Sequence, residues 1–401
     1  MKVFFYTLLI TINAHAKYVE VKKSEIPIQQ IIQNLEKKEK ENPSNIETKF
    51  QLARAYGLAA TMTTIQTAKT DNPLSDAIYG KPESVNPMFD GQKKSATEVD
   101  YYEKSLSQYN QILSTDPKNY QYILGRGWVY LQLQKIDLAR TDFMSIIDDI
   151  KPLNPSFIDS FLILIKIKDA PLLLKRKWDF SPFDRFFYKG AIKGYPLIKE
   201  TIHYLRPLLK ETHTDNVILK KIASISNDST ELAFMTPIIF PINKKTSYKD
   251  LKNENLYVQF NMDGMDTHTK WQWIKKDAAF LVFLGKSQKK LVSSGKELFG
   301  NVTFWIFWNN GYEALDSLDN NRDHYLSGKE LEGIFVWNDA NEDGVCTPEE
   351  IFNLNAFKIK KIATLYKHHK DDIDYNPNGL ILESGEFLPT YDWISKSKTE
   401  N

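Results

Sequence analysis

The pattern of apolar positions divides the chain into a long part with helical periodicity and a C-terminal part without it. Two stretches, "ENPSNIETKFQLARAYGLAA" and "TDPKNYQYILGRGWVYLQLQKIDLARTDFMSIIDDI", each carry Pro, then Asn two residues later, then apolar residues at helical spacing. The first stretch predicts a helix at about 46–60, and the second predicts a pair of helices that ends near residue 150. In that pair, we expect small residues to let the two helices approach each other and aromatic residues to fill the space between them.

The segment directly before Pro117, "YYEKSLSQYNQILSTD", predicts one more helix, with Tyr109 and Ile112 facing inward. It belongs with the helix at 46–60, and the polar segment at about 61–97 that separates them is interpreted as an inserted surface loop. The small and large positions of the following pair resemble those of a tetratricopeptide repeat (TPR): Gly127, Tyr130, Ala139 and Phe143. This resemblance implies TPR-like repeats over residues 25–150, with a concave face for a protein or peptide partner. A plain helical bundle with accidental matches is the alternative.

Residues 153–232 continue the helical pattern as a helical extension, cut into short pieces by prolines, and carry no recognisable chemistry. The texture changes at "MTPIIFPI" (235–242), which is apolar with two prolines and favours an extended segment. After a polar linker at 243–255, a separate module is expected at 256–395. The predicted fold class is therefore mainly α: N-terminal TPR-like hairpins and a helical bundle, followed by a small α+β module with paired EF-hand-type calcium loops.

The segment "DANEDGVCTPEE" at 339–350 fits a calcium loop. Ca²⁺ prefers six to eight hard oxygen ligands, and the EF-hand loop places them at positions 1, 3, 5, 7, 9 and 12, with glycine at position 6. Gly344 stands at position 6, and Pro348 suits the start of an exit helix. The predicted ligands, the fourth of them through its backbone carbonyl, are Asp339, Asn341, Asp343, Val345, Thr347 and Glu350.

A second match lies upstream in "DNNRDHYLSGKE" at 319–330. Its predicted ligands are Asp319, Asn321, Asp323, Tyr325 (backbone carbonyl), Ser327 and Glu330. The departure is His324, where glycine belongs. Position 6 favours positive φ, which costs a non-glycine residue on the order of 1 kcal/mol, so we expect a weakened loop. We predict two bound Ca²⁺ ions that are structural rather than regulatory; the alternative is two acidic turns flanking a short helix.

Only residues 331–338 separate the two loops, which is closer than in calcium sensors. With "WNDANEDGV" closing it, this spacing resembles the bacterial secreted calcium modules of RTX-type and dockerin-like proteins. The resemblance extends upstream from "NMDGMD" through "SSGKELFG" and "NNGYEALD", and covers about residues 257–357. It implies a bacterial exported protein that combines TPR-like repeats with an EF-hand-type module, and it implies calcium rather than any reaction. A further acidic pair of that pattern falls on Asn261 and Asp263, near Glu297, where we expect only a weak metal site.

The aromatic residues of the module admit two interpretations. They are Trp271, Trp273, Phe304, Trp305, Phe307, Trp308, Tyr312 and Trp337. We expect them to form the core of a small module, and the alternative is an exposed platform for carbohydrate. The single cysteine, Cys346, stands at position 8 of its loop, as Leu326 does in the other. Because paired EF-hand loops meet there, we expect Cys346 to pack against Leu326 as a small apolar residue.

Composition and the N-terminal residues narrow the function. The net charge is +1, from 52 basic and 51 acidic residues, which removes the electrostatic argument for a nucleic-acid partner. "MKVFFYTLLITINAHA" resembles a signal peptide (1–16) cleaved after Ala16, so we expect export to the periplasm or beyond and no membrane span in the mature chain. The sequence has no nucleophile elbow, phosphate loop or HExxH motif. We therefore expect an exported calcium-binding interaction or scaffold protein and not an enzyme. The alternative is an exported enzyme or carbohydrate-binding protein.

Overall fold

The computed structural model describes residues 26–67, 94–149, 201, 204–205, 208–209, 234–243, 246–264, 269–285, 291–368 and 373–398. The predicted signal peptide and nearly all of the predicted helical extension lie outside these residues, as does most of the predicted inserted loop.

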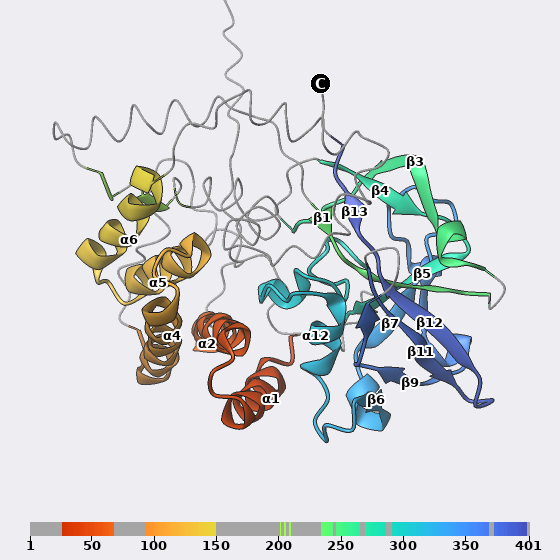
Figure 1. Cartoon of the computed structure of the whole chain (residues 1–401), viewed down its shortest axis with the longest axis horizontal. Helices are drawn as coiled ribbons and strands as arrows, with labels where there is room; N and C mark the ends of the chain where they lie inside the picture. Colours follow the sequence, from red (N-terminus) through yellow and green to blue (C-terminus); the bar gives the residue numbers. More distant parts are fainter. Residues whose placement is uncertain are drawn as a thin grey trace, which may run out of the picture.

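Helices of the N-terminal part stack side by side in chain order, at the left of Figure 1. They are α1 (Ile28–Glu41), α2 (Ile46–Thr67), α4 (Ala96–Thr115), α5 (Tyr120–Gln132) and α6 (Ile136–Asp149). Each packs mainly on its neighbours in this order. Helix α4 begins with a capping box, in which the Ser95 hydroxyl accepts from the Glu98 N–H and the Glu98 carboxylate accepts from the Ser95 N–H. Asn119 caps α5 in a similar way, because its side chain accepts from the backbone of the first turn.

The packing expected between the last two helices is confirmed. A Cβ atom at Gly127 would lie 2.5 Å from the Phe143 ring, and one at Gly125 would lie 2.3 Å from the Tyr109 hydroxyl. These glycines let α5 approach α6 on one side and α4 on the other. Ala139 and Phe143 are both fully buried in the same core cluster. The predicted TPR family relationship stays a prediction, because such packing also occurs in other helical bundles.

The C-terminal part is a curled antiparallel sheet, at the right of Figure 1. Its main sheet has nine strands in the order β6-β9-β11-β12-β2-β5-β7-β8, with β10 paired to β11. These strands are β2 (Ile238–Pro241), β5 (Ala278–Phe283), β6 (Tyr325–Ser327), β7 (Ile334–Trp337), β8 (Ile351–Asn353), β9 (Ile359–Ala363), β10 (Lys367–His368), β11 (Asp374–Leu382) and β12 (Phe387–Asp392). Two smaller pairs lie beside it: β3 (Lys252–Gln259) with β4 (Lys270–Ile274), and β1 (Phe234–Met235) with β13 (Ser395–Lys396).

Both faces of the sheet are buried at its middle strands β2, β5 and β7. Strand β5 shows this most clearly, because all six of its residues are buried and alternate between two cores. Ala279, Leu281 and Phe283 face a core completed by α1, α2 and the short helix α12 (Gly311–Asp316). Ala278, Phe280 and Val282 face the core of the β3–β4 hairpin. The first two helices and the sheet therefore share one hydrophobic core.

The predicted fold class is wrong. The chain was expected to be mainly α with a small α+β module of EF-hands, but the structure combines α-helices with a large antiparallel sheet. No EF-hand helix pair flanks the second loop in the described residues: it leaves β7 and ends in the 3-10 turn η6 (Pro348–Glu350) and β8. The physical reason is that short apolar runs such as "IFVW" pair with strands far away in the sequence, which helical or strand periodicity cannot reveal. Strand β2 also lies in the middle of this sheet, although the module was expected to start at residue 256.

Candidate functional site

The second predicted calcium loop is built around a fully buried carboxylate. Asp339 follows the end of β7 and has 0% of its surface exposed. Its Oδ2 accepts hydrogen bonds from the Trp273 indole N–H at 2.5 Å and from the Gly344 N–H at 2.8 Å. Burial raises the pKa of the Asp339 carboxyl, and the nearby charge of Glu350 raises it further. The fold therefore holds an acid where its charge is costly.

The other oxygens of this loop are held by the loop's own backbone. The Asn341 side-chain oxygen accepts from the Asp343 N–H at 3.2 Å, and Asp343 Oδ1 accepts from the Val345 N–H at 2.7 Å. The Glu350 carboxylate, which is buried, accepts from the Thr347 N–H at 3.0 Å. Side chains at positions 1, 3, 5 and 12 thus turn toward the inside of the loop. Among the described residues, no lysine, arginine or histidine forms an ion pair with these carboxylates.

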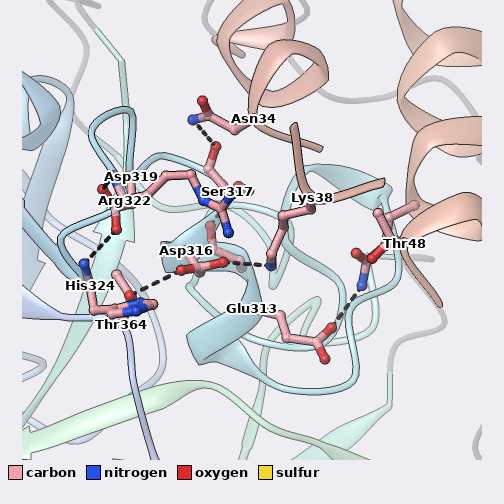
Figure 2. A network of polar contacts seen from close by, with 12 residues as sticks. Asn34, Lys38, Thr48, Glu313, Asp316, Ser317, Asp319, Arg322, His324 and Thr364 are labelled. Atoms are coloured by element: carbon pink, nitrogen blue, oxygen red, sulfur yellow. Dashed lines mark hydrogen bonds and ion pairs between the residues drawn. The ribbon is translucent and has the colours of Figure 1, made fainter. Parts of the chain in front are cut away.

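The first loop repeats this geometry position by position. Asp319 has 2% of its surface exposed and accepts from the Arg322 N–H at 2.7 Å and the His324 N–H at 2.8 Å (Figure 2). The Asn321 side chain accepts from the Asp323 N–H, and Asp323 accepts from the Tyr325 N–H, both at 2.9 Å. Burial raises the pKa of the Asp319 carboxyl as it does that of its counterpart.

The two loops also share an unusual backbone. At position 4 the φ angle is 60° in both, for Arg322 and Glu342. At position 6 it is 67° for His324 and 73° for Gly344, so the histidine does adopt the left-handed conformation expected of glycine. The two loops therefore match each other in backbone conformation as well as in residue types.

The structure also brings together a group that the spacing did not indicate. One ligand atom from each of Asp316, Asp319 and His324 lies within 4.8 Å of the others. Asp316 ends α12, and its carboxylate also contacts the Lys38 ammonium at 2.5 Å and the Thr364 hydroxyl at 3.1 Å (Figure 2). Its place three residues before Asp319 on a helical turn was the only sequence signal. In the described structure, the predicted carboxylates of neither loop converge as closely as this group.

The predicted weak metal site looks different from the two loops. The Glu297 carboxylate accepts from the backbone N–H groups of Ser293 at 2.5 Å and Ser294 at 3.0 Å, so it closes its own turn. The backbone carbonyl of Asn261 accepts from the Gly295 N–H at 2.9 Å, and Asp263 is buried nearby. A metal ion at Asn261, Asp263 and Glu297 stays a prediction.

The aromatic residues form a core. Trp271, Trp273 and Trp337 are 0% exposed, and the ring centroids of the last two lie 5.6 Å apart. Of the aromatic residues considered for carbohydrate binding, only Phe307 is not buried, and it is half-buried under the Arg54 guanidinium at 4.4 Å. These side chains therefore offer no open platform for stacking on a sugar.

The predicted contact between Cys346 and Leu326 is wrong. Leu326 pairs with Ile362 of β9 and belongs to the core shared with α1 and α2. Cys346 is half-buried against the core of the β3–β4 hairpin, on the other face of the sheet. The loops do not meet as EF-hand loops do, because β7 carries the chain across the sheet between them. Burial raises the pKa of the Cys346 thiol to about 11.

Part of the C-terminal region is similar in sequence to known proteins. The sequence model of the SPM domain matches residues 247–390, from just before the 3-10 turn η3 (Tyr248–Asp250) into β12. The chain is also similar to the iron-regulated protein FrpA of Neisseria meningitidis serogroup C, with 28% identity over 138 residues. That match covers 33% of this chain and 12% of the length of FrpA. Helices α1 to α6 lie outside the SPM match. No helix within the described ranges is both long and apolar enough to cross a membrane.

Proposed function

We propose that the chain is an exported calcium-binding interaction protein. The loops at 319–330 and 339–350 each bind one Ca²⁺ and stabilise the sheet, and the helices α2 to α6 offer a surface to a protein partner. The observation that carries the calcium proposal is the Asp339 carboxylate, which is 0% exposed and accepts from the Trp273 indole N–H at 2.5 Å and from the backbone N–H groups of Gly344 at 2.8 Å and Asp343 at 3.3 Å.

The electrostatic argument is one of compensation. Moving a carboxylate out of water costs several kcal/mol unless a cation or several donors offset the loss of hydration. Asp339 lies near Glu350, whose negative charge raises the cost further. Since no basic side chain is paired with either acid in the described structure, a hard cation fits this loop chemically.

The repeated backbone supports the same proposal for the first loop. Side-chain oxygens of positions 1, 3 and 5 accept from backbone N–H groups in both loops. Bound Ca²⁺ would supply charge compensation at these oxygens, and the buried start of each loop would exclude water. The ligands that we propose for the first loop are those predicted from its sequence, and His324 at position 6 lowers its affinity for Ca²⁺.

Thermal unfolding of the full mature chain tests the calcium proposal. Ca²⁺ at 100 times its dissociation constant should stabilise the folded state by about 2.7 kcal/mol per site through mass action. Asp339→Asn keeps the oxygen acceptor but removes the charge, so it should reduce the shift. Glu349→Gln removes an exposed acid from the same loop and should leave the shift unchanged. Equal shifts in all three proteins, or none in the wild type, would contradict the proposal.

The interaction and export parts of the proposal have separate tests. Leu138 of α6 and Val99 of α4 are exposed apolar residues of the helical stack, at 49% and 38%. Cross-linking in the producing cell should yield a partner that is lost in Leu138→Lys and kept in Lys118→Glu. Mass measurement of the exported chain should give a first residue of Lys17 if cleavage follows Ala16.

A further inference from the structure

One polar face of helix α1 packs on residues 316–322, at the start of the first loop. Three of its side chains donate hydrogen bonds there: Gln30 Nε2 to the Leu318 carbonyl at 2.9 Å, Asn34 Nδ2 to the Ser317 carbonyl at 3.0 Å and to Asn320 Oδ1 at 3.1 Å, and Lys37 Nζ to the Asn320 carbonyl at 3.2 Å. Two ion pairs complete the contact, Lys38 with Asp316 and Glu41 with Arg322. Figure 2 shows Asn34 directed toward Ser317 and Lys38 directed toward Asp316. Asn34 is itself buried, at 3% exposed. We call these contacts the α1 clamp.

The clamp and the predicted calcium ligands alternate along the chain. Asp319, Asn321 and Asp323 at positions 1, 3 and 5 turn into the loop, where their side chains accept from the loop backbone. Asn320 and Arg322 at positions 2 and 4 turn out to the helix. Any ion that fixes the inward positions therefore also fixes the outward positions, because the same backbone carries both.

The second loop is connected differently. Its position 4, Glu342, accepts from the Lys276 N–H at 2.9 Å, and its position 2, Ala340, is exposed. Its glycine at position 6 packs on Val258 of the β3–β4 hairpin. The second loop thus belongs to the face of the sheet opposite the helices, and it serves as an internal control for the first.

We propose that calcium at the first loop regulates the docking of α1, and with it the helical stack, on the sheet. This inference rests on the proposed calcium function and assigns a different role to each loop. Calcium at the first loop stabilises the contact with the helices, and calcium at the second loop stabilises only the face of the sheet that packs on the β3–β4 hairpin. Linkage is reciprocal, so the α1 clamp must raise the calcium affinity of the first loop by the same factor by which calcium strengthens docking.

Hydrogen exchange of the full mature chain tests the forward direction. Calcium should slow exchange of the α1 amides at least fivefold in the wild type and in Asp339→Asn, and should leave it unchanged in Asp319→Asn. Exchange in β7 and β8 should show the opposite dependence on the two variants. Equal loss of α1 protection in both variants would overturn the inference, because calcium would then act by general stabilisation.

Calorimetry tests the reverse direction in the Asp339→Asn background, where only the first loop binds. Adding Asn34→Ala should weaken calcium binding at least fivefold, and adding Lys40→Ala, an exposed position on the same helix, should not. The calorimetric comparison is one of calcium affinities and not of melting temperatures, and Lys40→Ala, which retains the clamp, is its reference. Calcium binding that is unaffected by Asn34→Ala overturns this inference alone. A complete lack of binding in Asp339→Asn overturns the calcium function of the first loop as well.

Discussion

Trp273 donates its indole N–H to the Asp339 carboxylate at 2.5 Å, across a separation of 66 residues in the sequence. This bond fixes the first residue of the second loop to the hairpin that covers one face of the sheet. Both side chains are 0% exposed, so the loop entrance and the aromatic core form one unit.

Trp273→Phe tests that unit. The variant keeps most of the ring but removes the indole donor to the buried carboxylate, which then has only backbone donors, and hydrogen bonds to charged groups contribute about 1.5–3 kcal/mol. Trp271→Phe is the matched control, because that indole is equally buried and its N–H has no hydrogen-bond partner in the described structure. In urea unfolding, Trp273→Phe should lose about 1–3 kcal/mol more than the control. Equal losses would show that the bond to Asp339 contributes nothing.

Gly344→Ala tests the close approach of the second loop to the hairpin. Its φ of 73° strains any other residue, and a Cβ would lie 2.5 Å from Val258 Cγ2. Gly328→Ala has a similar φ of 54° but meets nothing within 4 Å, so it isolates the backbone cost of roughly 1 kcal/mol. Gly344→Ala should be the less stable by a further 1–3 kcal/mol or so in urea unfolding. A difference near zero would mean that the hairpin moves away freely.

The helices could be predicted from sequence because their contacts are local. The apolar spacing of residues 46–60 and 120–149 indicated α2, α5 and α6, and the glycine at 127 indicated their close packing. The sheet could not be predicted, because "AAFLVF" in β5 is buried on both faces and so lacks the alternation of an ordinary strand. Likewise, the loop spacing indicated the acidic positions, whereas the hydrogen bonds of the α1 clamp join residues that are 281 to 288 positions apart in the sequence.

Gly127→Ala tests the helix packing. The new Cβ would lie 2.5 Å from the Phe143 ring, and overpacking of this kind typically costs about 1–3 kcal/mol. Phe143→Leu makes space at the same point, so Gly127→Ala should cost less in that background. Thermal unfolding of the four proteins measures the coupling. Additive losses would contradict the contact.

Asp392 predicts a pH dependence that is independent of the proposed calcium loops. This carboxylate is buried, accepts from the Gly311 N–H at 2.8 Å, and has its pKa raised well above 3.8 by desolvation. Because the folded pKa is the higher one, its contribution to stability is complete below the unfolded pKa and is lost as pH rises through the folded pKa. Asp392→Asn should therefore gain stability relative to the wild type as pH increases from 4 to 8. The melting temperatures measured across this range should diverge, and parallel curves would contradict the assigned shift.

The number of calcium ions bound per chain tests the central claim most directly. Calorimetric titration of the metal-free protein should give two Ca²⁺ for the wild type, one for Asp319→Asn, one for Asp339→Asn and none for the double variant. Glu349→Gln should still bind two. Two ions in the double variant, or none in the wild type, would contradict the assignment of calcium to these loops.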